Sequence, residues 1–595
     1  MRSLKLFFIA PLFLSLIQSC GGSADGTDEN GDPNALVKVE GGKFSGGVMR
    51  INSIEDYTTL FPAGINDVYS NHVAGNVYEG LFRFDQKTLE TMPALAESFT
   101  IDKSKTVYTF KIRKGVKFHD DECFSDGVGR EVTAEDVKYC LDYVCSDHEA
   151  NKWNTVFNHV IDGVDAYKKG AKDVSGIKVI DNNTLEIKLE SPLASFPDML
   201  ALLATGVYPK EAIDKYGYDG MSNHMVGTGP FYATEIANGS KVVFKKNKNY
   251  WRTDEFGNQL PFLSEIHMSF IKDKKEELEA FKNDELDMVW GIPVEEIPNI
   301  MGSLEEAKEG KNKEFEVQSV NSLNIQYYGF KFNSEVFSDV NVRKAFNYAV
   351  DRDSLVEFVL EGEGIPAHNG FVPPMTGYPY EAVKGYSYDP ALAKQYMAKA
   401  GYANGKGFPE LTLYLNKSGG VNVKIAEFLT GMLKNNLGVT VKMEAMSMAD
   451  LYPRVEKGEF DFWRFGWIAD YPDPASFLHL FHSTTKAGEP GDNYFGYSNP
   501  KFNEVYEAAL KEIDQEKRNK LYAEADQIVM DDAVIMPLMF NVGIRLINPQ
   551  VKDFDINEME YRDLAVVNMV EKQKSNVRVY DNLFDEEEEL GNNPQ

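Results

Sequence analysis

Apolar and polar residues alternate with a period of two in several short segments of the chain. Residues 107–112 (VYTFKI) and 185–189 (LEIKL) both show this pattern, and turn residues flank them. Such alternation predicts half-exposed strands of a mixed sheet. Residues 460–474 (FDFWRFGWIADYPDP) begin with the same pattern, and two prolines then end the predicted strand.

Other segments repeat their apolar residues at helical spacing. Helices are predicted over residues 66–80, 133–144, 275–283, 340–350, 389–400 and 421–437. The last two end at Gly401 and Gly438, and glycine commonly closes a helix. Each of these two helices precedes an apolar strand, over residues 411–415 and 439–443. The alternation of strand and helix predicts an α/β fold with helices on both faces of a sheet.

The N-terminus has the features of an export signal. Arg2 and Lys5 supply a positive start, and residues 6–17 form an apolar run that is too short to span a membrane stably. The run ends in Ile-Gln-Ser-Cys, which resembles a bacterial lipobox and predicts that Cys20 becomes the lipidated first residue. Gln18 departs from the small residue usual at its position, so soluble secretion after cleavage nearby is the alternative.

Composition predicts a flexible start and an acidic surface for the exported chain. Residues 20–42 are rich in Gly, Asp, Glu and Asn and predict a tether. The formal charge of −30 becomes −32 once the signal, residues 1–19, is removed with its two basic side chains. An acidic surface repels polyanions, so nucleic acid is a poor partner. Residues 579–595 contain the run DEEEE and predict a disordered acidic tail.

Three cysteines remain besides Cys20, and export makes one disulfide plausible. Cys140 and Cys145 lie five residues apart in a predicted helix, which is poor geometry for pairing with each other. A bridge from Cys123 to Cys140 or to Cys145 is therefore the disulfide we expect, and three buried thiols are the alternative. Neither CxxC nor HxxxH spacing occurs, so no metal site is predicted.

Motifs typical of enzymes are missing from the sequence. It contains no GxSxG, no GxxxxGK[ST], no GxGxxG and no HExxH. Its nine histidines are scattered; His479 and His482 are spaced to share a helix face, but no third ligand is near them in sequence. We therefore expect neither an enzyme nor a resident cofactor.

Residues 460–474 carry the most informative chemistry. Asp470 is a single carboxylate that follows Trp463 and Trp467 at the end of the predicted strand. Aromatic walls around one sheltered charge suit a small cationic ligand. A strand end capped by an Asx-turn explains the same residues.

This segment resembles the ligand-contacting strand and loop of the oligopeptide-binding proteins, the extracytoplasmic receptors of peptide ABC transporters. Five further segments resemble that family in the same order along the chain, namely residues 78–85 (YEGLFRFD), 93–118, 227–231 (GTGPF), 332–353 and 522–538. The resemblance implies an α/β, two-lobed periplasmic-binding-protein type II fold with an extra N-terminal subdomain and two crossings between the lobes.

The resemblance also implies the domain boundaries. Lobe I is expected to comprise residues 43–76, 207–321 and 535–578, the extra subdomain residues 77–206, and lobe II residues 322–534. The chain then passes between the lobes near residues 321–329 and near residues 532–538. Two crossings form a hinge that lets the lobes open and close around a ligand.

Two charged residues of residues 460–474 have expected roles in this family. The acid at the position of Asp470 takes the ammonium group of a bound peptide. The arginine at the position of Arg464 serves the carboxylate end of the peptide. An intramolecular salt bridge is the alternative for Arg464, since six residues of a straight strand separate the two charges by about 20 Å.

The strand between them is expected to hold the peptide main chain. Backbone groups of Gly466, Trp467 and Ile468 can pair with an extended peptide as an added strand. Trp467 and Tyr471 are expected to line side-chain pockets, and core packing is the alternative for both.

A second wall is expected from other parts of the chain. Tyr69, Asn71 and His72 stand just before the subdomain, where relatives approach their ligand, although His72 alone is typical of a surface histidine. Asn416 begins a strand-to-helix loop, residues 416–420, whose N–H groups can meet a peptide carboxylate. Helix capping by Ser418 explains that loop equally well.

The sequence thus predicts a substrate-binding lipoprotein of an ABC importer. It would capture di- or oligopeptides and deliver them to permease subunits in the inner membrane, which cytoplasmic ATPases drive. The protein is expected to be a monomer on the periplasmic or cell-envelope side, held to a membrane by its lipid. One alternative is the same scaffold binding a nickel chelate, haem or an oligosaccharide, which does not require Asp470. A more distant one is a glycan-handling or enzymatic surface lipoprotein.

Overall fold

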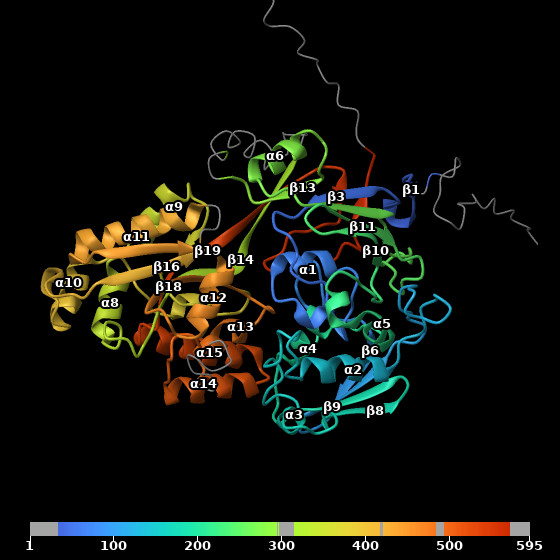
Figure 1. The fold of residues 1–595 in the computed structure, drawn as a ribbon, viewed down its shortest axis with the longest axis horizontal. Helices are drawn as coiled ribbons and strands as arrows, with labels where there is room; N and C mark the ends of the chain where they lie inside the picture. Colours follow the sequence, from blue (N-terminus) through green and yellow to red (C-terminus); the bar gives the residue numbers. More distant parts are fainter. Residues whose placement is uncertain are drawn as a thin grey trace, which may run out of the picture.

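The computed structural model describes residues 34–293, 315–416, 420–483 and 493–571, together with residues 32 and 296. It has two lobes and an additional subdomain, as expected (Figure 1). The predicted signal, Cys20 and the acidic tail lie outside the described residues. Within those ranges, no helix combines the length and the apolar character needed to cross a membrane.

Lobe I is built on a four-stranded sheet that joins three strands from residues 231–269 with one strand from residues 48–52. Its order is β10 (Phe231–Ala237), β11 (Lys241–Lys246), β12 (Glu265–Ser269) and β3 (Val48–Asn52), with β12 and β3 parallel. The C-terminal piece joins this lobe, because the N–H of Phe262 donates to the carbonyl of Ala565 at 3.2 Å. Helix α6 (Lys274–Lys282) and strand β13 (Met288–Trp290) complete the lobe near β3.

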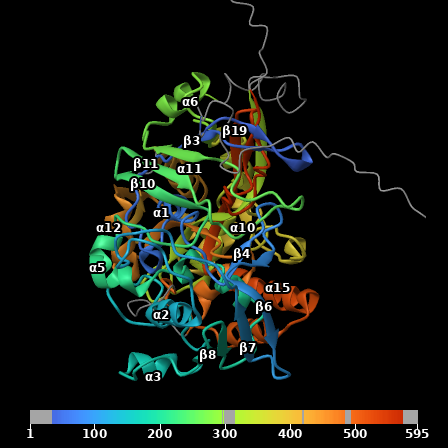
Figure 2. The same cartoon turned by 90° about the vertical axis from the view of Figure 1, so that its right-hand side faces the viewer.

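The subdomain is a second sheet covered by helices. Its strand order is β6 (Ala96–Ile101), β7 (Val107–Ile112), β9 (Thr184–Lys188) and β8 (Ile177–Asp181), and β4 (Phe82–Phe84) pairs with β5 (Thr91–Pro93) beside it. The two strands predicted from alternation are neighbours in this sheet. Helix α2 (Ala134–Val144) begins at Thr133 in a capping box, as its sequence predicts. In both views the subdomain lies at the opposite end of the molecule from α6 (Figures 1 and 2).

Lobe II surrounds most of the largest sheet, to which lobe I contributes β13. The order is β13, β19 (Ile535–Ile547), β14 (Glu316–Phe330), β18 (Phe462–Ile468), β16 (Leu411–Asn416) and β17 (Val441–Met446), and β15 (Ile365–Pro366) pairs with β19. Its helices include α8 (Val340–Tyr348), α9 (Arg352–Val359), α10 (Pro390–Lys399), α11 (Val421–Leu437), α12 (Met448–Glu456), α14 (Pro500–Lys511) and α15 (Gln515–Asp531). The predicted helices ending at Gly401 and Gly438 are α10 and α11, and Gly438 has the left-handed conformation that closes α11.

Strands β14 and β19 form a long antiparallel ribbon that runs from one lobe to the other (Figure 1). Their pairing shifts register twice, first between Asn321 and Ile325, opposite Val542 and Phe540, and again between Gln326 and Tyr327, opposite Met539 and Pro537. These shifts lie within or beside residues 321–329 and 532–538, where the two crossings are expected.

Two expectations about local structure need correction. The helix expected over residues 66–80 is shorter, α1 (Val68–Ala74), because Asp67 caps its start and Gly75 ends it. The expected disulfide from Cys123 is not formed, and all three described cysteines are thiols. The thiol of Cys140 instead donates to the carbonyl of Tyr208 at 3.4 Å. Burial, and next the nearby carboxylate of Asp121, raise the pKa of Cys123 to about 12.

Candidate functional site

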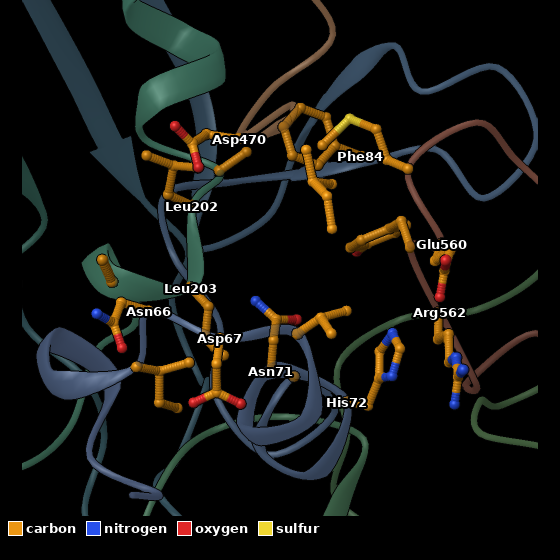
Figure 3. A pocket seen from close by; sticks show the side chains of 18 of the residues that line it. Asn66, Asp67, Asn71, His72, Phe84, Leu202, Leu203, Asp470, Glu560 and Arg562 are labelled. Atoms are coloured by element: carbon orange, nitrogen blue, oxygen red, sulfur yellow. The ribbon is translucent and has the colours of Figure 1, made fainter. Parts of the chain in front are cut away.

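A cavity of about 510 Å³ lies between lobe I, the subdomain and lobe II. This volume is in the range of pockets that enclose small ligands. Helix α1 and the turn after it form one wall, β18 and its following loop form another, and residues 559–563 of the C-terminal piece close one side (Figure 3). Six of the expected site residues line it: Asn71, His72, Gly466, Trp467, Ile468 and Asp470.

Strand β18 presents a backbone edge to this cavity. On one side it pairs antiparallel with β14, with Gly466 opposite Gln326. On the other side its pairing with β16 is limited to Trp463 opposite Tyr414. Among the described residues, therefore, no strand pairs with that side of β18 beyond Trp463, so this edge can accept an extended chain.

Two residues at this edge are constrained by their neighbours. A Cβ atom at Gly466 would lie 2.9 Å from Oε1 of Gln326, so a larger residue fits there only if the Gln326 side chain moves. The indole N–H of Trp467 donates to the carbonyl of Ser476 at 2.6 Å, and its ring packs edge-on against His479 at 5.1 Å. Trp467 therefore lines the cavity in a held orientation.

Asp470 follows β18 directly and is half-buried at the wall of the cavity. Its backbone N–H donates to Oγ of Ser476 at 2.8 Å, which fixes the start of the loop. Oδ1 of Asp473 accepts from the N–H of Ala475 at 2.9 Å. The Asx-turn considered for this loop is thus made by Asp473.

Arg464 and Asn416 are placed outside the cavity wall, against the expectation for both. The guanidinium of Arg464 donates to Oδ1 of Asn416 at 2.9 Å and to Oε1 of Gln326. These partners are neutral, so the alternative of an intramolecular salt bridge is not formed within the described ranges. Burial lowers the pKa of Arg464. The two residues contact each other across the neighbouring strands β16 and β18, with Asn416 at the end of β16.

The two tyrosines also lie outside the cavity wall. Tyr471 packs against apolar residues of both lobes, and burial raises its pKa well above the ordinary value. Core packing, the alternative considered for Tyr471, is what the structure contains. Burial and next the charge of Glu55 raise the pKa of Tyr69 to about 12. Its neighbours Asn71 and His72 supply the polar wall from α1.

The C-terminal segment around Arg562 was not expected from the sequence. Side-chain amides hold its backbone: Nδ2 of Asn76 donates to the carbonyl of Arg562 at 2.9 Å, and Oε1 of Gln86 accepts from the N–H of Asp563 at 2.7 Å. Nδ2 of Asn557 donates to the carbonyl of Tyr561 at 2.7 Å. No helical or alternating pattern marks this segment, and its partners Asn76 and Gln86 lie more than 450 residues earlier in the chain, so local sequence gives little signal for it.

Glu560, Arg562 and His72 lie together at one side of the cavity (Figure 3). Burial raises the pKa of Glu560. Burial, and next the positive charge of Arg562, lower the pKa of His72 well below its ordinary value. The neighbouring Asp563 is paired with Arg252 at 2.8 Å. This side of the cavity therefore carries positive character at Arg562.

Comparisons with known proteins find relatives over most of the chain. Residues 90–489 match the family model for bacterial extracellular solute-binding proteins, family 5, middle part. The chain is 29% identical over 542 residues to the oligopeptide-binding protein OppA of Bacillus subtilis, covering 89% of this chain and 92% of OppA. It is 28% identical over 491 residues to heme-binding protein A of Haemophilus influenzae, covering 81% and 85%. The structure of Helicobacter pylori DppA in complex with the peptide STSA has a TM-score of 0.74 at 26% identity, over 88% of this chain and 98% of that one.

Proposed function

The chain belongs to the bacterial extracellular solute-binding proteins of family 5, and we propose that it captures peptides in the cavity between its lobes for an ABC importer. The peptide is then delivered to permease subunits in the inner membrane, which cytoplasmic ATPases drive. The protein acts as a monomer and catalyses no reaction on its ligand.

The backbone edge of β18 beside Asp470 is the observation that carries this proposal. An extended peptide adds to that edge through main-chain hydrogen bonds, which fix it without reading its side chains. Asp470 then stands where the chain of the peptide begins, and its carboxylate pairs with the α-ammonium group. Trp467 covers the first side chain with an apolar surface.

Native mass spectrometry of the protein purified from cells tests the ligand class. We expect a series of bound masses that correspond to short peptides and that remain uncleaved on incubation, because a receptor needs no bond cleavage. Similarity to heme-binding protein A makes haem the second candidate. A single bound species with the mass of haem would contradict peptide binding and identify haem as the ligand.

We further propose that lipid on Cys20 holds the protein to a membrane, with residues 20–42 as a tether. Replacing Cys20 by Ser removes the thiol that carries the lipid, so the variant should move from the membrane fraction to the soluble fraction. Fractionation with a salt wash, followed by detection with antibody, measures this. A Cys20→Ser protein that stays in the washed membranes would exclude the anchor.

A further inference from the structure

Arg562 differs from the other arginines in the part of the chain that the structure describes. Each of the others has a hydrogen bond or an ion pair with an oxygen atom. Arg252, for example, is paired with Asp563, and Arg343 donates to three or more backbone carbonyls. The guanidinium of Arg562 has no such partner among the described residues, although it lines the cavity. Its five N–H donors are therefore available to a bound molecule.

The backbone at Arg562 is nevertheless fixed. Its carbonyl accepts from Nδ2 of Asn76, and Oδ1 of the same Asn76 accepts from the N–H of Leu564 at 2.9 Å. One side chain, from the turn after α1, thus holds the backbone on both sides of Arg562. A backbone that is fixed before binding leaves only the side chain to be ordered when a ligand arrives.

Neighbouring acids leave the N–H donors of this cation without a bonded partner. Glu277 is paired with Lys274 at 2.6 Å and accepts from Asn52 at 3.0 Å. Glu560 lies beside Arg562, and its charge acts on the guanidinium, but the two form no salt bridge within 4.0 Å. The buried guanidinium of Arg545 adds a second positive charge nearby. A charge that is partly desolvated and unpaired favours an anionic partner.

Asp470 and Arg562 lie on opposite sides of the cavity (Figure 3). One side therefore offers a carboxylate and the other a guanidinium, with the backbone edge of β18 ending at Asp470. This arrangement matches a ligand with an ammonium group at one end and a carboxylate further along.

We propose that Arg562 binds a carboxylate of the captured peptide, in a bidentate contact that selects for an anionic group at that distance from the α-ammonium. This inference rests on the proposed peptide-binding function and adds a specificity-determining residue to it. Arg562 takes the role that the sequence alone suggested for Arg464, which is instead engaged by Asn416 and Gln326 outside the cavity wall.

Calorimetric titration with matched peptides tests the inference. A peptide recovered from the protein is compared with its C-terminal amide and with a version in which each acidic side chain is replaced by its neutral amide, on wild type and Arg562→Gln. We expect one of the two changes to weaken binding to wild type by about 30-fold or more. The same change should alter binding to Arg562→Gln by less than about threefold. The arm that responds identifies the C-terminal or the side-chain carboxylate.

Three further variants control this experiment. Arg562→Lys keeps the charge and should restore part of the discrimination, while Arg454→Gln, whose arginine pairs with Glu459 on the surface, should behave as wild type. Arg464→Gln tests whether Arg464 binds the carboxylate instead, and this variant should discriminate between the peptides as wild type does. Equal binding of the neutral peptide to wild type and Arg562→Gln shows that the variant cavity is intact.

The outcomes separate the inference from the function on which it rests. Discrimination that persists in Arg562→Gln, or that is lost in Arg464→Gln instead, would overturn the role of Arg562 while leaving peptide capture in place. Equal affinity of wild type for all the matched peptides would also overturn the role of Arg562 and leave peptide capture in place. Failure of every peptide to bind wild type would overturn the proposed function and this inference together.

Discussion

Asp526 on α15 is fully buried and accepts hydrogen bonds from the N–H of Phe371 at 2.9 Å, the N–H of Val372 at 3.2 Å and the hydroxyl of Tyr378 at 2.8 Å. It forms no ion pair with any described residue. Burial outweighs these donors and raises its pKa from 3.8 to about 6. Between pH 4 and pH 6, Asp526 is therefore protonated in the folded protein and ionised in the unfolded chain.

This shift predicts how stability depends on pH at one residue. Because the native state binds more protons in that window, the free energy of unfolding contributed by Asp526 falls as pH rises, by about 3 kcal/mol in total. Urea unfolding of wild type and Asp526→Asn tests this. Between pH 3.5 and pH 7, the free energy of unfolding of wild type should fall relative to that of Asp526→Asn, which carries no titrating group at this position. A difference that stays constant over this range would contradict the raised pKa.

Single residues also show how far sequence reasoning reaches. Asp470 and Trp467 line the cavity and could be singled out because an acid after two tryptophans at a strand end is a local pattern; their contact with a ligand stays a prediction. The placement of Arg464 could not be predicted, since it depends on which strands flank β18. Asn416 of β16 and Gln326 of β14 both reach it across the sheet. Arg562 lies in an irregular segment whose partner Asn76 is remote in sequence.

Among the elements, strands β14 and β18 pack closely at one glycine. Gly329 is directly opposite Trp463, which is 1% exposed, and a Cβ atom at Gly329 would overlap the indole ring. We expect Gly329→Ala to lower the free energy of unfolding by about 1–3 kcal/mol, because the rigid ring has no room to move. Thermal unfolding measured by circular dichroism tests this.

Gly431 in α11 provides the matched control for that substitution. A Cβ atom there meets nothing within 4 Å, and its backbone is helical. Gly431→Ala should therefore raise the free energy of unfolding by up to about 1 kcal/mol, through helix propensity. If both alanine variants shift stability in the same direction by the same amount, the overlap with Trp463 is not the cause.

Helix ends were the elements most readily predicted. Thr133 and Gly438 mark ends that the structure reproduces, because a cap depends on residues within one turn of it. The helix after Asn66 was predicted too long, since its pattern continues past Gly75 into buried residues of the pocket wall. Pairing of distant strands, such as β3 with β12, depends on the whole fold, and no local pattern marks it.

For the whole molecule, we expect the ribbon of β14 and β19 to act as the hinge between the lobes. Its pairing shifts register between Asn321 and Ile325 and again between Gln326 and Tyr327, so bending there should change the angle between the lobes with little change inside either one. A ligand that contacts both walls favours the closed form. Small-angle X-ray scattering should show a smaller radius of gyration with saturating peptide. An unchanged radius alongside demonstrated binding would argue against this hinge.

The most direct test of the whole account concerns the charge on Asp470. Its carboxylate is proposed to pair with the α-ammonium of the peptide inside a closed cavity. Asp470→Asn keeps the shape of the side chain and removes its charge. The α-ammonium of the peptide is then buried without an anionic partner, which should cost about 2–5 kcal/mol of binding free energy. That loss corresponds to about 30-fold to several-thousand-fold in affinity. Asp461→Asn removes a charge just before β18, outside the cavity wall, and should bind as wild type.

Calorimetry with free and N-acetylated forms of one peptide, on wild type and Asp470→Asn, measures this pairing. We predict that acetylation weakens binding to wild type about as much as the mutation does, and weakens binding to Asp470→Asn little further. Equal affinity of wild type for the free and the acetylated peptide would contradict the account.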